Sequence, residues 1–116
     1  KRFIAGVSLS GLFALWASCR THLFEGVASV SGSFWYDKFT EWFSTQEYSS
    51  SRYYFSLGEK EKEGKNLRLA AVEEETAKIM STLQANEKEV IFEYNEGNHF
   101  GPLIERIEKA IINIMQ

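Results

Sequence analysis

Two hydrophobic patterns alternate along the chain. The first is a short, mostly apolar run bounded by glycine or polar residues, which is typical of a strand in the interior of a sheet. Runs of this kind predict four strands, at Arg2 to Val7, Gly26 to Val30, Tyr53 to Leu57 and Lys88 to Tyr94. The third strand is aromatic rather than β-branched, which also suits a pleated surface.

The second pattern repeats every three to four residues and predicts helices between the strands. Residues Gly11 to Thr21 are apolar nearly all round, which predicts a helix packed between a sheet and other elements. A later helix is expected to gather its apolar residues on one face, namely Leu69, Val72, Thr76, Ile79, Met80 and Leu83. The last helix, Leu103 to Met115, is expected to turn four isoleucines inward, Ile104, Ile107, Ile111 and Ile114. Because strands and helices alternate, we expect an α/β fold with a mostly parallel sheet flanked by helices.

The turn between the first strand and its helix has a pattern that exposes a serine nucleophile. Small residues at Gly6 and Ser10 flank Ser8, and a larger side chain at either position would collide as the helix packs back over the strand. Such a turn holds the serine in a strained backbone conformation, so that its hydroxyl stands clear of the sheet. The helix N-terminus favours an oxyanion beside the serine, and the backbone N–H of Leu9 is the expected donor.

A serine hydroxyl needs a base within hydrogen-bond reach, and histidine titrates in the useful range. His22 lies just past the first helix, where the chain turns away from the carboxyl ends of the strands, and we interpret it as a surface residue. His99 follows the fourth strand in a glycine-containing loop and is the expected general base. A carboxylate should orient the histidine, and the segment after the third strand offers Glu59 and Glu61.

An aromatic segment, Phe34-Trp35-Tyr36, follows the second strand and is expected to overhang the face on which Ser8 opens. Aromatic side chains in such loops commonly line an acyl or aryl pocket, which makes these three residues candidates for substrate binding. A lid packed on the core would have the same composition. The sequence leaves both interpretations open.

Composition and charge limit the classes of partner. The net charge is −3 over 116 residues and the basic residues are interspersed with acidic ones, so we expect no nucleic-acid partner. The single cysteine, Cys19, cannot form an internal disulfide, and its place on the apolar helix predicts a buried, inert thiol. No apolar stretch has the length of a membrane span. We expect no metal and no cofactor, and the sequence does not fix the cellular compartment.

Four motifs occur in an order and with a spacing that match a known family. They are Gly6-Val7-Ser8-Leu9-Ser10-Gly11-Leu12-Phe13-Ala14-Leu15, Ser31-Gly32-Ser33-Phe34-Trp35-Tyr36-Asp37, Gly58-Glu59-Lys60-Glu61 and Gly97-Asn98-His99-Phe100. With these motifs the chain resembles, over its whole length, the esterases of the esterase D and enterochelin esterase type. The resemblance implies an α/β-hydrolase fold, Ser8 as nucleophile, His99 as base, Glu61 rather than Glu59 as acid, and a carboxylic ester as substrate. The family's turn usually ends in two glycines, whereas Ser10 here replaces the first and is expected to add a hydroxyl at a crowded contact.

The resemblance also implies that residues 1–116 are the carboxyl-terminal portion of a single α/β-hydrolase domain, because the chain begins on a strand that this fold places in mid-sheet. The open edge would then need cover from the N-terminal half, a partner or a second copy. The second oxyanion donor is expected upstream, so the isolated chain is expected to be nearly inactive, with about 3 kcal/mol of transition-state stabilisation lost. Two other functions stay open: a non-catalytic binding module that retains the fold, and an acyltransferase that uses the same three residues.

Overall fold

A computed structural model describes residues 2–36, 38–58, 71–95 and 103–115. Strands and helices alternate along the described chain, as the hydrophobic pattern predicts. In chain order the elements are β1 (Phe3–Val7), α1 (Leu9–Arg20), β2 (Gly26–Val30), α2 (Phe39–Phe43), β3 (Arg52–Gly58), α4 (Val72–Ala85), β4 (Glu89–Asn95) and α5 (Leu103–Met115). Every predicted strand is confirmed to within a residue at each end.

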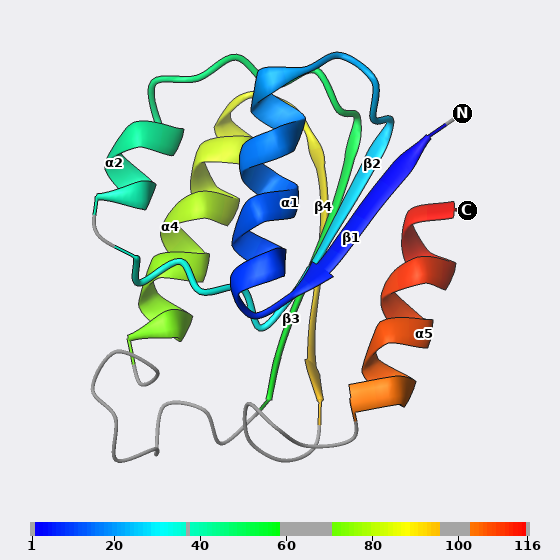
Figure 1. Ribbon diagram of the computed structural model, residues 1–116. Helices are drawn as coiled ribbons and strands as arrows, with labels where there is room; N and C mark the ends of the chain where they lie inside the picture. Colours follow the sequence, from blue (N-terminus) through cyan, green and yellow to red (C-terminus); the bar gives the residue numbers. More distant parts are fainter. Residues whose placement is uncertain (1, 37, 59–70, 96–102, 116) are drawn as a thin grey trace.

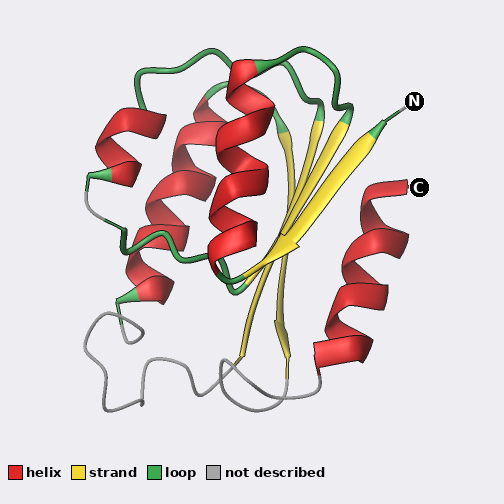
Figure 2. Ribbon diagram, in the orientation of Figure 1, coloured by secondary structure: helices red, strands yellow, loops and turns green. Residues whose placement is uncertain are grey.

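The four strands form one sheet in the order β1-β2-β3-β4, and each neighbouring pair is parallel. Helices α1, α2 and α4 cover one face of this sheet, and α5 covers the other (Figures 1 and 2). A parallel arrangement requires each connection to cross back over the sheet, which places helices on its faces. The predicted α/β class with a parallel sheet flanked by helices is therefore confirmed.

The core lies on both faces of the two central strands. On the side of α1 and α4, Val27, Tyr53 and Phe55 pack in one apolar cluster with helix residues such as Leu15 and Ile79. On the opposite side, a smaller cluster joins the sheet to α5, and its buried members are Ala28, Val30, Tyr54, Ala110 and Ile114. Alternate residues of each strand point to opposite faces, so a continuous apolar run fills both clusters.

Helix α5 buries a different face from the one predicted. Ile114 is buried, but Ile104 is 72% exposed and Ile111 is 41% exposed, so the predicted inward set is wrong for these two. The buried positions are Arg106, Ala110 and Ile114, which recur every four residues. Isoleucines occur around much of the helix, so their spacing could not select the buried face. The small Ala110 marks the face that packs on the sheet.

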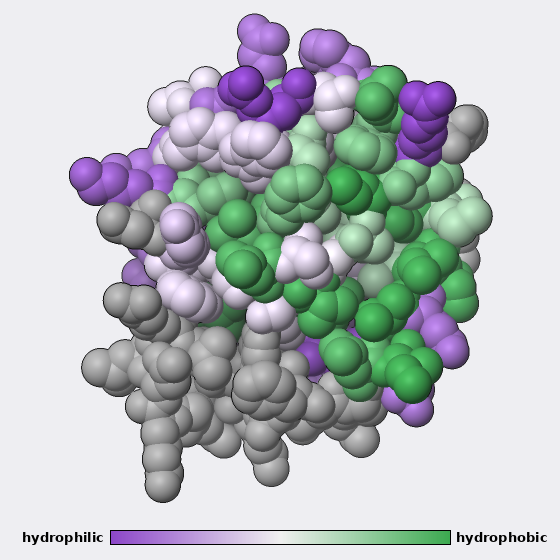
Figure 3. All heavy atoms as spheres, in the orientation of Figure 1, coloured by the Kyte–Doolittle hydropathy of each residue, from purple (hydrophilic) through white to green (hydrophobic). Residues whose placement is uncertain are grey.

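Strand β1 lies at one edge of the described sheet, and apolar side chains remain exposed around it. The two helices that contact β1 carry exposed apolar side chains, which include Leu9, Phe13 and Trp16 of α1 and Ile104, Ile111 and Met115 of α5. Figure 3 shows apolar residues gathered over α1, β1 and α5 on this face. Cover of this edge by another part of the protein or by a partner stays a prediction. Among the described helices, none is both long and apolar enough to cross a bilayer.

Candidate active site

Ser8 lies in the turn between β1 and α1, and its backbone conformation is unusual. Its φ is 58° and its ψ is −122°, a combination that residues other than glycine rarely adopt. Backbone hydrogen bonds hold it there: the Ser8 N–H donates to the Val30 carbonyl at 2.9 Å, and the Ser8 carbonyl accepts from the Ser33 N–H at 3.1 Å. The residue is half-buried at the start of α1. The strained backbone predicted for Ser8 is confirmed.

Glycine at position 6 is required by the close approach of α1 to β1. A Cβ atom on Gly6 would lie 2.1 Å from the carbonyl oxygen of Ser10, which is far inside van der Waals contact. One on Gly11 would lie 2.7 Å from Oγ of Ser29 in β2. The small residue predicted at position 6 therefore lets the helix start directly after Ser8.

The hydroxyl of Ser10 does not lie at the crowded contact predicted for it. Ser10 is exposed. Its Oγ accepts a hydrogen bond from the Val7 N–H at 2.8 Å and donates one to the Val7 carbonyl at 2.7 Å. Because the Ser8 N–H bonds to β2, the groups of Val7 point to the other side of the strand. Ser10 therefore satisfies the last peptide groups on the open side of β1.

Ser33 is a neighbour of Ser8 that sequence reasoning did not identify. Its Oγ lies 3.4 Å from Oγ of Ser8, and its side chain is almost fully buried. The register pairs Val7 with Val30, so the turn after β1 and the loop after β2 leave the sheet at the same level. In the sequence, Ser33 is indistinguishable from the other serine of that loop, Ser31. Only the pairing of the strands reveals which one meets Ser8.

The three residues of the aromatic segment that follows Ser33 differ in their surroundings. Phe34 is buried in the core, where its ring stacks on Phe39 at 5.7 Å and meets Phe55 edge-on at 6.0 Å. Trp35 is half-buried, and Tyr36 is 55% exposed. These residues line one side of a hollow of about 590 Å³. Phe34 is therefore a core residue, which is the alternative to substrate binding that the sequence left open, and substrate binding by Trp35 and Tyr36 stays a prediction.

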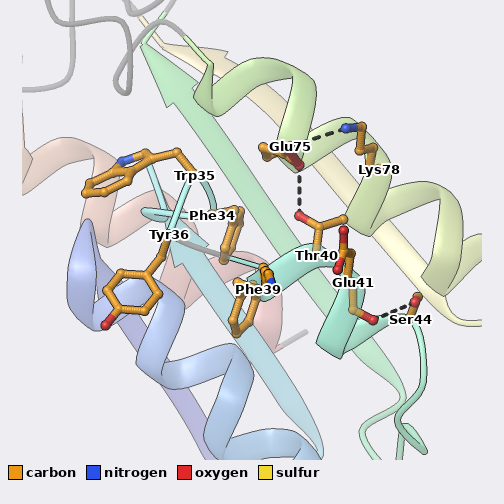
Figure 4. Close-up of a pocket in the computed structure, with 10 residues that line it drawn as sticks. Phe34, Trp35, Tyr36, Phe39, Thr40, Glu41, Ser44, Glu75 and Lys78 are labelled. Carbon is orange, nitrogen blue, oxygen red and sulfur yellow. Dashed lines mark hydrogen bonds and ion pairs between the residues drawn. The ribbon is translucent and has the colours of Figure 1, made fainter.

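The opposite side of this hollow is polar. Figure 4 shows the aromatic side chains of the loop on one side and side chains from α2 and α4 on the other. Oε2 of Glu75 accepts a hydrogen bond from Oγ1 of Thr40 at 2.8 Å, and Oε1 lies 3.4 Å from Nζ of Lys78. The hollow therefore combines an aromatic wall with a wall of hydroxyl, carboxylate and ammonium groups.

Two other residues of types that often act in catalysis, His22 and Cys19, do not contribute to this site. His22 is exposed beyond the far end of α1, a helix of 12 residues, which at 1.5 Å per residue separates it from Ser8 by about 18 Å. Its interpretation as a surface residue is confirmed. Cys19 is half-buried rather than fully buried, and burial raises the pKa of its thiol to about 11. The thiol therefore stays protonated at neutral pH and is a poor nucleophile.

The predicted base and acid, His99 and Glu61, lie outside the described residues, as does the alternative acid Glu59. What the structure describes is where their segments begin. β3 ends at Gly58 and β4 ends at Asn95, and these two residues are partners in the register. β3 and β4 therefore end on the same side of the sheet as β1, at the carboxyl ends of the parallel strands, where the turn that holds Ser8 also lies.

Comparisons with protein families, with curated proteins and with solved structures found no match to this chain. The fold and the turn define its class without a family: an α/β protein with a four-stranded, all-parallel sheet and a strained serine between the edge strand β1 and the N-terminus of α1.

Proposed function

We propose that this chain is part of an α/β-hydrolase domain that cleaves a carboxylic ester through a covalent intermediate on Ser8. The observation that carries the proposal is the backbone of Ser8, with φ 58° and ψ −122° at the N-terminus of α1. A residue other than glycine in such a conformation costs about 1–3 kcal/mol and is found preferentially at functional sites. A strand, a strained serine and a helix in succession form the arrangement that raises a nucleophile above a parallel sheet.

The sheet geometry is compatible with a meeting between His99 and Ser8. Three strand spacings separate β1 from β4, which amounts to about 14 Å. His99 is the fourth residue after the end of β4 at Asn95, and four residues span at most about 14 Å before the length of the side chain is added. The segment is therefore long enough to bring the imidazole to the hydroxyl.

In the proposed mechanism, Ser8 Oγ attacks the ester carbonyl while His99 removes its proton. Glu61 holds the imidazole in the required orientation and stabilises its charged form. The oxyanion accepts hydrogen bonds from the Leu9 N–H and from a second donor. Leu9 is in the first turn of α1, where a backbone N–H has no carbonyl partner within the helix. His99 then protonates the leaving alcohol. Water, activated by the same histidine, releases the acid and restores Ser8.

The hollow beside the aromatic segment is the proposed site for the acyl or alcohol group of the substrate. It begins directly after Ser33, whose hydroxyl lies 3.4 Å from that of Ser8. An ester with an apolar group could contact Tyr36 and Trp35, and a polar substituent could reach Thr40 or Lys78.

Replacing Tyr36 by alanine should therefore raise KM and leave kcat nearly unchanged. An aromatic contact contributes about 1 kcal/mol, which corresponds to about a fivefold increase in KM. The test is the steady-state hydrolysis of p-nitrophenyl esters with acyl chains of increasing length. Tyr36→Phe keeps the ring and should retain the KM of the unchanged protein. Equal KM values for Tyr36→Ala and the unchanged protein across the series would exclude the hollow as the binding site.

The proposed function is tested by covalent labelling and by the kinetics of the first turnover. Treatment with a fluorophosphonate should add one adduct, and peptide mapping by mass spectrometry should find it on Ser8 and not on an exposed serine such as Ser81 of α4. Mixing with a p-nitrophenyl ester should release a burst of p-nitrophenol equal to the protein concentration. A protein that contains this chain, is folded and gives neither an adduct on Ser8 nor a burst is not a serine hydrolase, and a binding module then becomes the better interpretation.

A further inference from the structure

A fully buried arginine lies on the inner face of α5. Arg106 is 1% exposed and is among the largest fully buried side chains of the described chain. A guanidinium is almost never fully buried unless its N–H groups find acceptors, because removing the charge from water is costly. The other buried residues of α5 are the apolar Ala110 and Ile114, so the apolar pattern of the helix does not account for a buried arginine. The hydrogen-bond partners of Arg106 therefore indicate its role.

Two hydrogen bonds join Arg106 to the ends of two different strands. Its Nε donates to Oδ1 of Asn95, the last residue of β4, at 3.0 Å. One of its terminal nitrogens donates to Oγ of Ser31, the first residue after β2. Strand β3 lies between β2 and β4, so the guanidinium bridges strands that do not touch each other.

Both partners have features that packing alone does not explain. Ser31 has a positive φ of 48°, a conformation that residues other than glycine rarely adopt. Among the residues that the structure describes, Nδ2 of Asn95 is buried and has no hydrogen-bond partner, and leaving a buried donor unpaired costs about 1–3 kcal/mol. An apolar residue at position 95 would avoid this cost. The asparagine therefore serves the contact with Arg106.

We propose that Arg106 is a positioning residue. By holding Ser31 and Asn95 at a fixed distance from each other, it aligns the loop beside Ser8 with the segment that carries His99. Ser31 lies two residues before Ser33, and the Ser33 hydroxyl lies 3.4 Å from that of Ser8. Asn95 lies four residues before His99. The planar guanidinium donates in a fixed fork geometry, so it fixes the distance between its two acceptors more narrowly than a lysine can. This inference rests on the proposed function, since it assigns Arg106 a role in aligning nucleophile and base.

The test compares Arg106→Lys and Arg106→Gln with Lys109→Gln. Lys109 is an exposed residue of the same helix, so its variant matches the lost charge without touching the loops. The readouts are kcat, KM, the rate of fluorophosphonate labelling, the pH profile of kcat/KM, and the thermal unfolding midpoint. A displacement of about 1 Å between reacting groups lowers turnover by up to about 100-fold. We therefore expect both Arg106 variants to lose at least about tenfold in kcat and in labelling rate with KM within about twofold of the unchanged protein.

The outcomes separate the inference from the proposed function. If the unchanged protein labels on Ser8 and the folded Arg106 variants label at the same rate with the same pH profile, the positioning role is wrong and the proposed function stands. If the unchanged protein does not label on Ser8, both fall. Should the Arg106 variants fail to fold, Ser31→Ala decides, because it removes one acceptor and keeps the Cβ and the charge. A wild-type labelling rate in Ser31→Ala overturns the inference, and a loss confined to kcat supports it.

Discussion

Replacing Ser8 by alanine is expected to lower kcat for ester hydrolysis by about a million-fold, which is the size of effect seen when a nucleophile that acts as part of a triad is removed. The fluorophosphonate adduct should disappear with it. The residual rate should come from binding and from the oxyanion donors alone. Turnover is measured with a p-nitrophenyl ester on the protein that contains this chain, and Ser81→Ala, an exposed serine of α4, serves as the matched control.

A second variant at the same position separates the catalytic role from the structural one. Ser8→Gly should be as inactive as Ser8→Ala. Its free energy of unfolding should be higher than that of Ser8→Ala, because glycine adopts a φ of 58° without steric cost. The difference in the free energy of unfolding between the two variants should be about 1–2 kcal/mol. Chemical denaturation measures it. If Ser8→Gly is no more stable than Ser8→Ala, the turn is not strained and the principal support for the proposed function is lost.

Replacing His99 by glutamine should lower kcat by about 10⁴-fold or more, because the hydroxyl of Ser8 then has no base. Combining this change with Ser8→Ala should cause little further loss, since residues that act as a unit are strongly non-additive. The comparison of the two single variants with the double variant, by steady-state kinetics, tests whether they act together. A double variant whose loss equals the product of the two single losses would show that the residues act independently.

The same assay decides between the two candidate acids. Glu61→Gln should lower kcat by about 10⁴-fold, the effect expected when the residue that orients the histidine is removed. Glu59→Gln should leave kcat within about twofold, because Glu59 then takes no part in orienting the histidine. The reverse result would assign the role to Glu59 and correct the choice implied by the family resemblance. If both variants keep their activity, neither glutamate is the acid, and the proposed mechanism loses its third residue.

Much of the local structure could be predicted because it depends on short spacings. The strained conformation at Ser8 follows from a strand that meets a helix with Gly6 and Gly11 at the points of closest approach. The buried face of α4 was also predictable: Val72, Thr76, Ile79 and Leu83 are buried and Met80 is half-buried, whereas Leu69 of the predicted set lies outside the described residues. The face of α5 was not, since its isoleucines occur around much of the helix and only contact with the sheet selects the side with Ala110.

The surroundings of Ser8 depended on pairings that no local pattern encodes. Ser33 reaches Ser8 from 25 positions away, and Thr40 meets Glu75 across 35 positions. Arg106 and Ser31 are separated by 75 positions. Serine, threonine and arginine at these places are ordinary surface composition when read along the sequence, so nothing marks them as neighbours until the strands are in register.

The sequence by itself determined the alternation of strands and helices, the parallel sheet and the serine turn, because each follows from backbone sterics and from apolar spacing over a few residues. Only the tertiary structure decided which loop residue stands beside Ser8, which face of α5 is buried, and which strand ends Arg106 joins. Those outcomes depend on the order and register of the strands, which bring together residues that are far apart in the chain and whose interactions are therefore invisible to any local pattern.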